Sequence, residues 1–142
     1  MENISEMITR LGQNARKAAV SMRRLTTAQK NSMLLAMADA LERERKAIVA
    51  ANAEDVARAK AAGLAPALVD RLVLTPARFD EMVAGVREVA SLPDCVGELI
   101  YERNRPSGIT IRKVREPFGV VAVVFESRPN VLVDTAALCL KT

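Results

Sequence analysis

The fold class follows from the sequence Glu116-Pro-Phe-Gly-Val-Val-Ala-Val-Val-Phe-Glu-Ser-Arg-Pro-Asn130. Its middle part, residues 120–125, is apolar throughout and rich in β-branched side chains, which is typical of a parallel strand covered on both faces. Polar residues follow directly, at the carboxyl end of the predicted strand. Because open α/β sheets place their ligands at this end of their strands, the sequence predicts an α/β fold with a binding site at the corner formed by the polar residues that follow the strand.

The candidate binding residues are the five that form this corner. Pro129 disfavours helix at the preceding residue, and Asn130 can cap a predicted helix over residues 131–140. The segment is therefore predicted to form a strand, a polar corner and a helix, in this order. The corner consists of Glu126, Ser127, Arg128, Pro129 and Asn130.

The predicted strand needs neighbours that these residues do not supply. In a parallel sheet the next strand follows the crossover helix, which here ends close to Thr142. Full burial of each apolar side chain of the strand is worth roughly 1.5–3 kcal/mol, so their sum is comparable with the net stability of a domain. We therefore expect these residues to be the opening part of a larger protein, or a chain that finds its missing strands in a partner.

Composition excludes several classes of protein. Half of the 142 residues are hydrophobic and 27% are charged, so the chain can bury the core of one domain and is not disordered. The net charge of +4 is small, basic residues alternate with acidic ones, and only 3% are aromatic, which argues against nucleic-acid binding. No apolar run is long enough to suggest a membrane span or a secretory signal.

The residues that usually carry nucleophilic or metal chemistry are scarce. The chain has no histidine, which excludes Ser-His-Asp and Cys-His systems and His-Glu-x-x-His zinc sites within it. Its two cysteines form neither a zinc framework nor a disulfide scaffold, so we expect no metal and a cytoplasmic, reduced protein. Cys139 lies in an apolar run and is predicted to be a small buried hydrophobe. Cys95 lies in a turn that can expose it.

Most of the chain before the corner is predicted to be helical. Apolar residues recur every three or four positions from Ile4 to Met22, and Thr26 with Gln29 has capping-box spacing for a second helix through Ile48. A further helix is expected through residues 52–59, ending at Gly63. A short helix is expected at 67–72, and Thr75 with Pro76 starts a helix that ends at Leu92 and Pro93.

Residues 98–101 and 109–114 are predicted to form a hairpin around a turn at 104–108. Two interpretations of its charge stay open: an edge ribbon kept soluble by charge, or a phosphate-binding surface. Neither standard Gly-rich phosphate loop occurs in the chain. The basic residues of the hairpin are Arg103, Arg105, Arg112, Lys113 and Arg115.

The corner and the helix after it resemble the γ-glutamyl phosphate reductase family, a branch of the aldehyde dehydrogenase superfamily. The similarity runs through essentially the whole chain, which corresponds to about the first third of such an enzyme. It is carried by Phe118-Gly-Val-Val-Ala-Val-Val-Phe-Glu-Ser-Arg-Pro-Asn-Val131 and Val133-Asp-Thr-Ala-Ala-Leu-Cys-Leu-Lys-Thr142, and upstream by Ala51-Asn-Ala-Glu-Asp-Val56, Ala62-Gly-Leu64, Asp70-Arg-Leu72, Leu74-Thr-Pro-Ala-Arg78 and Val96-Gly97.

The resemblance implies an activity. Members of this family reduce γ-glutamyl phosphate with NADPH to glutamate γ-semialdehyde and phosphate, through a cysteine thioester, in proline biosynthesis. It also implies a homo-oligomer and functional coupling to glutamate 5-kinase. The nucleophilic cysteine is expected beyond Thr142, because neither Cys95 nor Cys139 matches its motif, so no catalytic residue is assigned within the chain. The preference for NADP(H) over NAD(H) comes from the resemblance alone.

The resemblance also bears on two corner residues. Many relatives have Pro-Trp-Asn-Phe-Pro at the corner, with an asparagine that donates to the oxyanion, whereas this chain has Glu126-Ser-Arg-Pro-Asn130 in a shifted register. Asn130 is therefore either an oxyanion donor or only a helix cap. Arg128 suits a substrate with phosphate and carboxylate groups, since a guanidinium binds both through paired hydrogen bonds. Its alternative role is an ion pair with Glu126 or Asp134.

The expected organisation has three parts. Residues 1–95 form a helical layer of the cofactor-binding domain, residues 96–116 a hairpin of the kind that joins subunits, and residues 117–142 the first strand and helix of an incomplete, Rossmann-like NADP-binding domain. The rival interpretation is a non-catalytic assembly module built from the same helices and hairpin.

Overall fold

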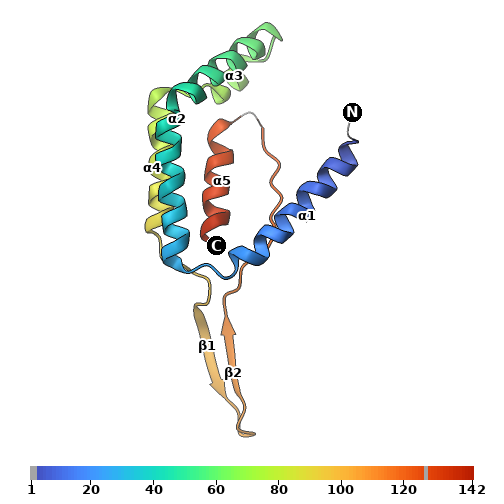
Figure 1. Cartoon of the computed structure of the whole chain (residues 1–142), viewed down its shortest axis with the longest axis vertical. Coiled ribbons are helices and arrows are strands. Elements are labelled where there is room, and N and C mark those ends of the chain that lie inside the picture. Colours follow the sequence, from blue (N-terminus) through green and yellow to red (C-terminus); the bar gives the residue numbers. More distant parts are fainter. Residues whose placement is uncertain (1–2, 127) are drawn as a thin grey trace. The chain divides into compact units, whose positions relative to one another are not determined.

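A computed structural model describes residues 3–126 and 128–142 of the chain (Figure 1). In chain order its elements are α1 (Ile4–Met22), α2 (Thr27–Ala61), α3 (Pro66–Leu72), α4 (Pro76–Ser91), β1 (Leu99–Asn104), β2 (Thr110–Val114) and α5 (Pro129–Lys141). The chain divides into two compact units. One contains α1 and the hairpin of β1 and β2, and the other contains α3, α4, α5 and almost all of α2.

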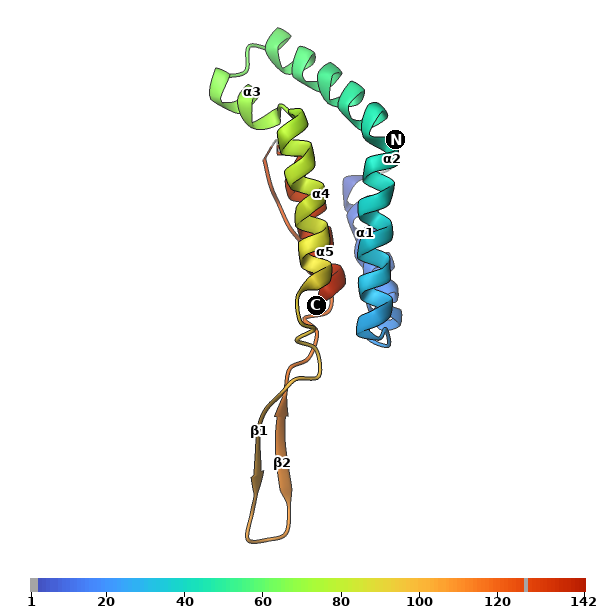
Figure 2. The same cartoon turned by 90° about the vertical axis from the view of Figure 1, so that its left-hand side faces the viewer.

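The core belongs to the unit that contains α2, α4 and α5. Helix α4 buries residues spaced by three and four positions, as an amphipathic helix does, and it packs against α5 along the length seen in Figure 2. Phe79, Leu34 and Val86 are the largest side chains that are fully buried. The buried cluster consists of Leu34, Ala38, Leu74, Phe79, Met82, Val83, Val86, Ala90 and Ala137.

Helix α2 is continuous over 35 residues, so the prediction of two separate helices in this region is wrong. The reason is local, because residues 48–52 contain neither glycine nor proline and nothing there ends a helix. The predicted stop at Gly63 is confirmed. Gly63 has a φ of 73°, and the amide of Leu64 donates to the carbonyl of Ala59 at 3.1 Å, as in a Schellman motif.

The start of α4 is fixed by its cap and by a buried asparagine. The side chain of Thr75 accepts a hydrogen bond from the Arg78 amide at 3.2 Å, which confirms the predicted cap. Asn52, only 9% exposed, donates to the Leu72 carbonyl at 2.9 Å and accepts from the Leu74 amide at 2.8 Å. These two bonds tie α2 to the turn between α3 and α4.

Arg45 joins α2 to α4 over the edge of the core. Its guanidinium lies 4.3 Å from the ring centroid of Phe79 and pairs with Glu42 at 2.9 Å and Asp80 at 2.5 Å. The hydrogen bonds that it donates to Asp80 and Glu42 raise the pKa of Arg45 above its usual value. Arg45 is therefore charged at every pH of interest.

Two buried lysines meet where α4 and α5 end. Lys141 is 3% exposed, and its Nζ donates to Asn31 Oδ1 at 2.6 Å and to the Ala90 carbonyl at 3.0 Å. Lys30 is 5% exposed and donates to the Lys141 carbonyl at 3.1 Å. The last carbonyls of a helix have no intrahelical partner and carry partial negative charge. The two ammonium groups therefore stabilise both helix ends.

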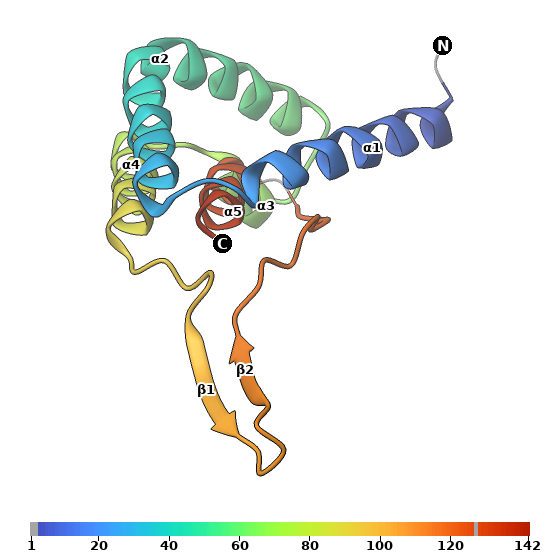
Figure 3. The same cartoon turned by 60° about the horizontal axis from the view of Figure 1, so that its bottom comes forward.

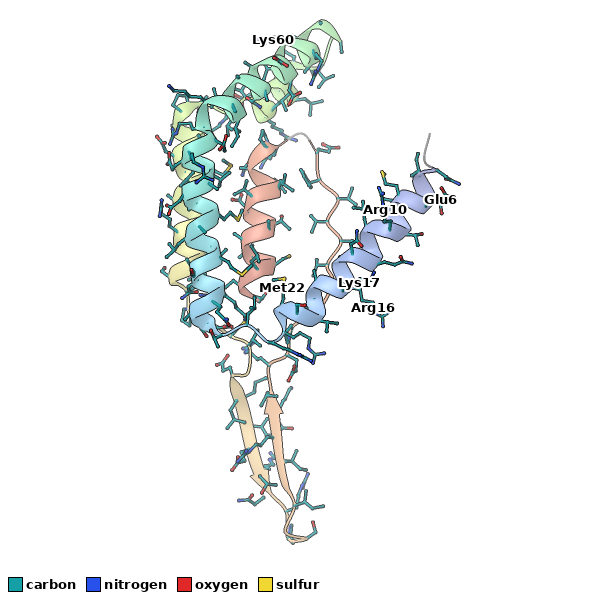
Figure 4. The ribbon with its side chains drawn as sticks, viewed as in Figure 1. Glu6, Arg10, Arg16, Lys17, Met22 and Lys60 are labelled. Atoms are coloured by element: carbon teal, nitrogen blue, oxygen red, sulfur yellow. The ribbon has the colours of Figure 1, made fainter. Side chains whose placement is uncertain are left out.

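The other unit exposes most of its apolar side chains. Helix α1 confirms the predicted range but buries no residue, and Ile4 is 74% exposed. Its charged residues Glu6, Arg10, Arg16 and Lys17 are spread along the same helix (Figure 4). Among the described residues, α1 thus has an apolar face without a covering layer.

The predicted hairpin is confirmed. Its strands are antiparallel (Figure 3), with Glu102 opposite Arg112 and Asn104 opposite Thr110. Every residue of both strands is exposed. Glu102 pairs with Arg112 at 2.5 Å and Glu98 with Arg115 at 2.7 Å. These pairs neutralise part of the basic charge and fit the edge-ribbon interpretation better than a phosphate-binding surface.

Residues 120–125 carry neither helix nor strand, so the predicted strand is not formed within the described part of the chain. Their side chains are exposed, with Val124 at 100% and Val121 at 51%. A strand exists only through hydrogen bonds to a neighbour, and among the described residues the one sheet is the hairpin. The fold class is nevertheless as expected: a helical layer, a hairpin and a helix after an incomplete sheet.

Candidate functional site

A cavity of about 400 Å³ lies where the start of α5 meets α3 and α4. Three of its lining residues come from the predicted corner, Asp134 comes from α5 just after it, and the others come from segments some 50 residues earlier in the chain. Its volume is within the roughly 300–1,000 Å³ that is typical of small-molecule sites. The lining residues are Asp70, Arg71, Val73, Leu74, Arg78, Glu81, Met82, Arg128, Pro129, Asn130 and Asp134.

The corner side of the cavity is set by proline. Pro129 is the first residue of α5, a position that suits its fixed φ and missing N–H. The positive end of the α5 dipole therefore lies at the cavity and favours an anionic group there. Arg128 precedes the helix, is exposed and makes no ion pair among the described residues, so neither Glu126 nor Asp134 neutralises it.

Asn130 does not cap α5, so that prediction is wrong. The helix starts one residue earlier, which places Asn130 in the first turn, where its Nδ2 donates to Asp134 Oδ2 at 2.9 Å. Residues four apart lie on the same face of a helix, and this pair lines the cavity. The hydrogen bond fixes the Asn130 amide and leaves its oxygen available as an acceptor.

The opposite wall is built from α3 and the first turns of α4. Arg78 pairs with Asp70 Oδ2 at 3.0 Å and donates to the carbonyls of Asp70 and of Val73, the latter at 2.9 Å. Its guanidinium is therefore held by three acceptors. Because Thr75 caps the same helix and Asn52 holds the same turn, this wall has a defined position within its unit.

The lining carries balanced charge of both signs. Three arginines and three carboxylates contribute to it, and one pair, Asp70 with Arg78, is already formed. Arg71, Arg128, Glu81 and Asp134 have no ion-pair partner among the described residues. The cavity can therefore accept a small ligand that itself carries both positive and negative groups.

The structure brings together three of the five predicted corner residues. Arg128, Pro129 and Asn130 line the cavity, whereas Glu126 does not, and Ser127 lies outside the described residues. The wall residues Asp70, Arg71, Arg78 and Glu81 were not predicted as site residues. A signal for three of them was present, since residues 70–72 and 74–78 are among the motifs of the family resemblance.

Neither cysteine lies in the cavity. Cys139 is exposed, so the prediction of a buried hydrophobe is wrong, while Cys95 is half-buried. Helix α5 buries only the face that contains Ala137 and Lys141, and Cys139 lies on a different face. Within residues 3–126 and 128–142 no three acidic, cysteine or histidine side chains group as they would around a metal, and no helix is long and apolar enough to cross a membrane.

Two solved structures resemble the chain over most of its length. One is a gamma-glutamyl phosphate reductase from Thermotoga maritima, with 41% identity and a TM-score of 0.87 over 91% of this chain and 31% of that one. The other is a gamma-glutamyl phosphate reductase from Saccharomyces cerevisiae, with 37% identity and a TM-score of 0.90 over 99% of this chain and 35% of that one.

The similarity predicted from the sequence is therefore confirmed, and it concerns the amino-terminal portion of these proteins. The chain spans about a third of the length of the structures it matches. No model of a known protein family matches it.

Proposed function

We propose that this chain is the amino-terminal part of a γ-glutamyl phosphate reductase, an enzyme that reduces γ-glutamyl phosphate to glutamate γ-semialdehyde and phosphate in proline biosynthesis. The main support is the match to two such reductases at 37–41% identity, with TM-scores of 0.87 and 0.90. The cavity at the corner adds to it, because Arg128 and the start of α5 suit an anionic substrate.

The reaction needs groups that these residues do not contain. A cysteine thiolate attacks the acyl phosphate, phosphate leaves and the thioester is reduced, and covalent catalysis of this kind requires an activated nucleophile. Neither Cys95 nor Cys139 lies at the cavity. Within this chain, Arg128 binds an anionic group of the substrate, and the second N–H of the Asn130 amide, which does not bond Asp134, donates to the acyl oxygen.

The proposed reductant is NADPH, which supplies a hydride. The corner cavity does not fit this cofactor, since three carboxylates beside three arginines are a poor match for the phosphates of a dinucleotide. We therefore place no part of the cofactor in this cavity.

The proposal includes the organisation expected from the sequence. Residues 1–95 form a helical layer, residues 96–116 a hairpin that joins subunits of a homo-oligomer, and residues 117–142 the first strand and helix of the cofactor domain. Exposure of both faces of the hairpin supports an interface role. Functional coupling to glutamate 5-kinase and a cytoplasmic location belong to the same proposal.

The rival proposal is a non-catalytic assembly module. The uncovered apolar face of α1 and the exposed hairpin favour it, since both surfaces suit the binding of other chains and neither needs a catalytic site. It differs from the first proposal in requiring no downstream cysteine and no substrate.

The test is a phosphate-dependent assay of the purified full-length protein. With glutamate γ-semialdehyde, NADP⁺ and phosphate, we expect NADPH to form, and we expect its formation to stop when phosphate is left out, because the product is an acyl phosphate. The 142-residue chain alone should be inactive in the same assay. A full-length protein that produces no NADPH under these conditions would favour the assembly module.

A further inference from the structure

The cavity at the corner contains more charge than anion binding needs. Arg128 and the start of α5 account for one anionic group, but Glu81 on α4 and Arg71 on α3 also line the cavity. Both are exposed, and neither has an ion-pair partner among the described residues. A carboxylate that faces a site for an anion would weaken binding unless the ligand also carries a positive group.

Some of the charged residues that line the cavity already have partners within the protein, which limits the groups that can bind a ligand. Arg78 is held by Asp70 and by two backbone carbonyls, and Asp134 accepts a hydrogen bond from Asn130. Asp134 keeps its charge, because that hydrogen bond comes from a neutral amide. The charged groups left for a ligand are thus the guanidinium groups of Arg71 and Arg128 and the carboxylates of Glu81 and Asp134. A matching ligand carries anionic groups for the arginines and a cationic group for the carboxylates.

We propose that this cavity binds the substrate through its α-amino-acid end as well as its phosphate. Glu81 accepts hydrogen bonds from the α-ammonium group, Arg71 binds the α-carboxylate, and Arg128 at the start of α5 binds the phosphate. The assignment rests on the proposed reductase function and names the specificity-determining residues of that site. It also makes the cavity a substrate site and not a cofactor site.

The match is one of chemistry. An α-amino acid with a phosphorylated side chain has one ammonium and two anionic groups, whereas the phosphates of a nicotinamide cofactor present only negative charge. Paired hydrogen bonds from a guanidinium fit a carboxylate and a phosphate, and an ammonium group finds a charged acceptor in Glu81. A site that hydrogen-bonds a substrate group discriminates strongly against analogues that lack it.

The experiment uses the full-length enzyme in the phosphate-dependent direction with three aldehydes. Glutamate γ-semialdehyde carries both α groups, 5-oxopentanoate lacks the ammonium, and 4-aminobutanal lacks the carboxylate. A hydrogen bond between charged groups corresponds to roughly tenfold to hundredfold in affinity. Glu81→Gln should therefore lower kcat/KM for glutamate γ-semialdehyde at least about tenfold and leave that for 5-oxopentanoate unchanged.

Arg71→Gln gives the complementary result. It should remove the preference for glutamate γ-semialdehyde over 4-aminobutanal, while the KM for NADP⁺ stays the same in both variants. Glu88→Gln is the matched control, because Glu88 is exposed on the same helix but does not line the cavity. It should leave all three specificity ratios as in the wild type.

The outcomes separate the two proposals. If the wild type shows no phosphate-dependent oxidation of any of the three aldehydes, the reductase function itself is wrong. If it is active but Glu81→Gln keeps the wild-type preference for the ammonium-bearing substrate, the subsite assignment is wrong and the reductase function stands. A rise in the KM for NADP⁺ in Glu81→Gln or Arg71→Gln would make the cavity a cofactor site instead.

Discussion

Replacing Asn52 by alanine tests how the wall of the cavity is held. Asn52 is 9% exposed and bonds both the Leu72 carbonyl and the Leu74 amide, so its side chain is the link between α2 and the turn before α4. Asn52→Ala removes a donor and an acceptor at once. The Leu74 amide then has no replacement partner in its surroundings, because Leu74 is itself only 5% exposed.

The expected loss of stability in Asn52→Ala is large for the removal of one polar side chain. Loss of the bond to the Leu72 carbonyl costs about 1 kcal/mol, and the buried Leu74 amide left without an acceptor costs about 1–3 kcal/mol, so Asn52→Ala should destabilise this region by about 2–4 kcal/mol. Asn52→Asp keeps an acceptor for the Leu74 amide, but it places a buried carboxylate oxygen against the Leu72 carbonyl oxygen. It should therefore destabilise the region as well.

Hydrogen exchange at the Leu74 amide measures the link directly. Since about 1.4 kcal/mol corresponds to tenfold, a loss of about 2 kcal/mol speeds exchange roughly thirtyfold in Asn52→Ala. Glu54→Ala is the control, because Glu54 is exposed on the same helix, and it should leave exchange at Leu74 unchanged. Equal protection of the Leu74 amide in Asn52→Ala and the wild type would refute the reasoning.

Three further perturbations follow from the fold. Lys141→Met removes two hydrogen bonds to a buried ammonium group and should lower stability by about 2–4 kcal/mol in urea unfolding, and an unchanged midpoint would contradict the role of Lys141 at the helix ends. Gly63→Ala should cost about 1 kcal/mol, because φ is 73° there, and wild-type stability would argue against the Schellman stop. The 142-residue chain alone should self-associate in light scattering, since residues 120–125 expose apolar side chains, and a monodisperse monomer would count against this.

Local signals in the sequence were enough to predict most of the helices and turns. The cap formed by Thr75 and Pro76, the stop at Gly63 and the turn at residues 104–108 each depend on a few neighbouring residues, and the structure has all three. The prediction of a break within α2 was wrong, because no residue at 48–52 ends a helix. The spacing of apolar residues alone is not enough to locate the end of a helix. Exposure of Cys139 was missed because an apolar run does not reveal which face of a helix is covered.

The cavity could be predicted only in part. Arg128, Pro129 and Asn130 follow from the strand-like run before them, which points to a binding corner. The α3 and α4 residues of the opposite wall are separated from the corner by some 50 residues, so only packing brings Arg71, Arg78 and Glu81 to it. The hydrogen bond from Asn130 to Asp134 was missed for a simpler reason, since the helix begins at Pro129.

The central claim is that the corner forms part of the substrate site of a reductase, and the KM for phosphate in Arg128→Ala tests it most directly. In the full-length enzyme, oxidising glutamate γ-semialdehyde, the loss of a guanidinium that binds phosphate should raise this KM at least about tenfold. The KM for NADP⁺ should not change. Arg105→Ala, in the exposed hairpin turn, should leave both values as in the wild type. A wild-type KM for phosphate in Arg128→Ala would contradict the account.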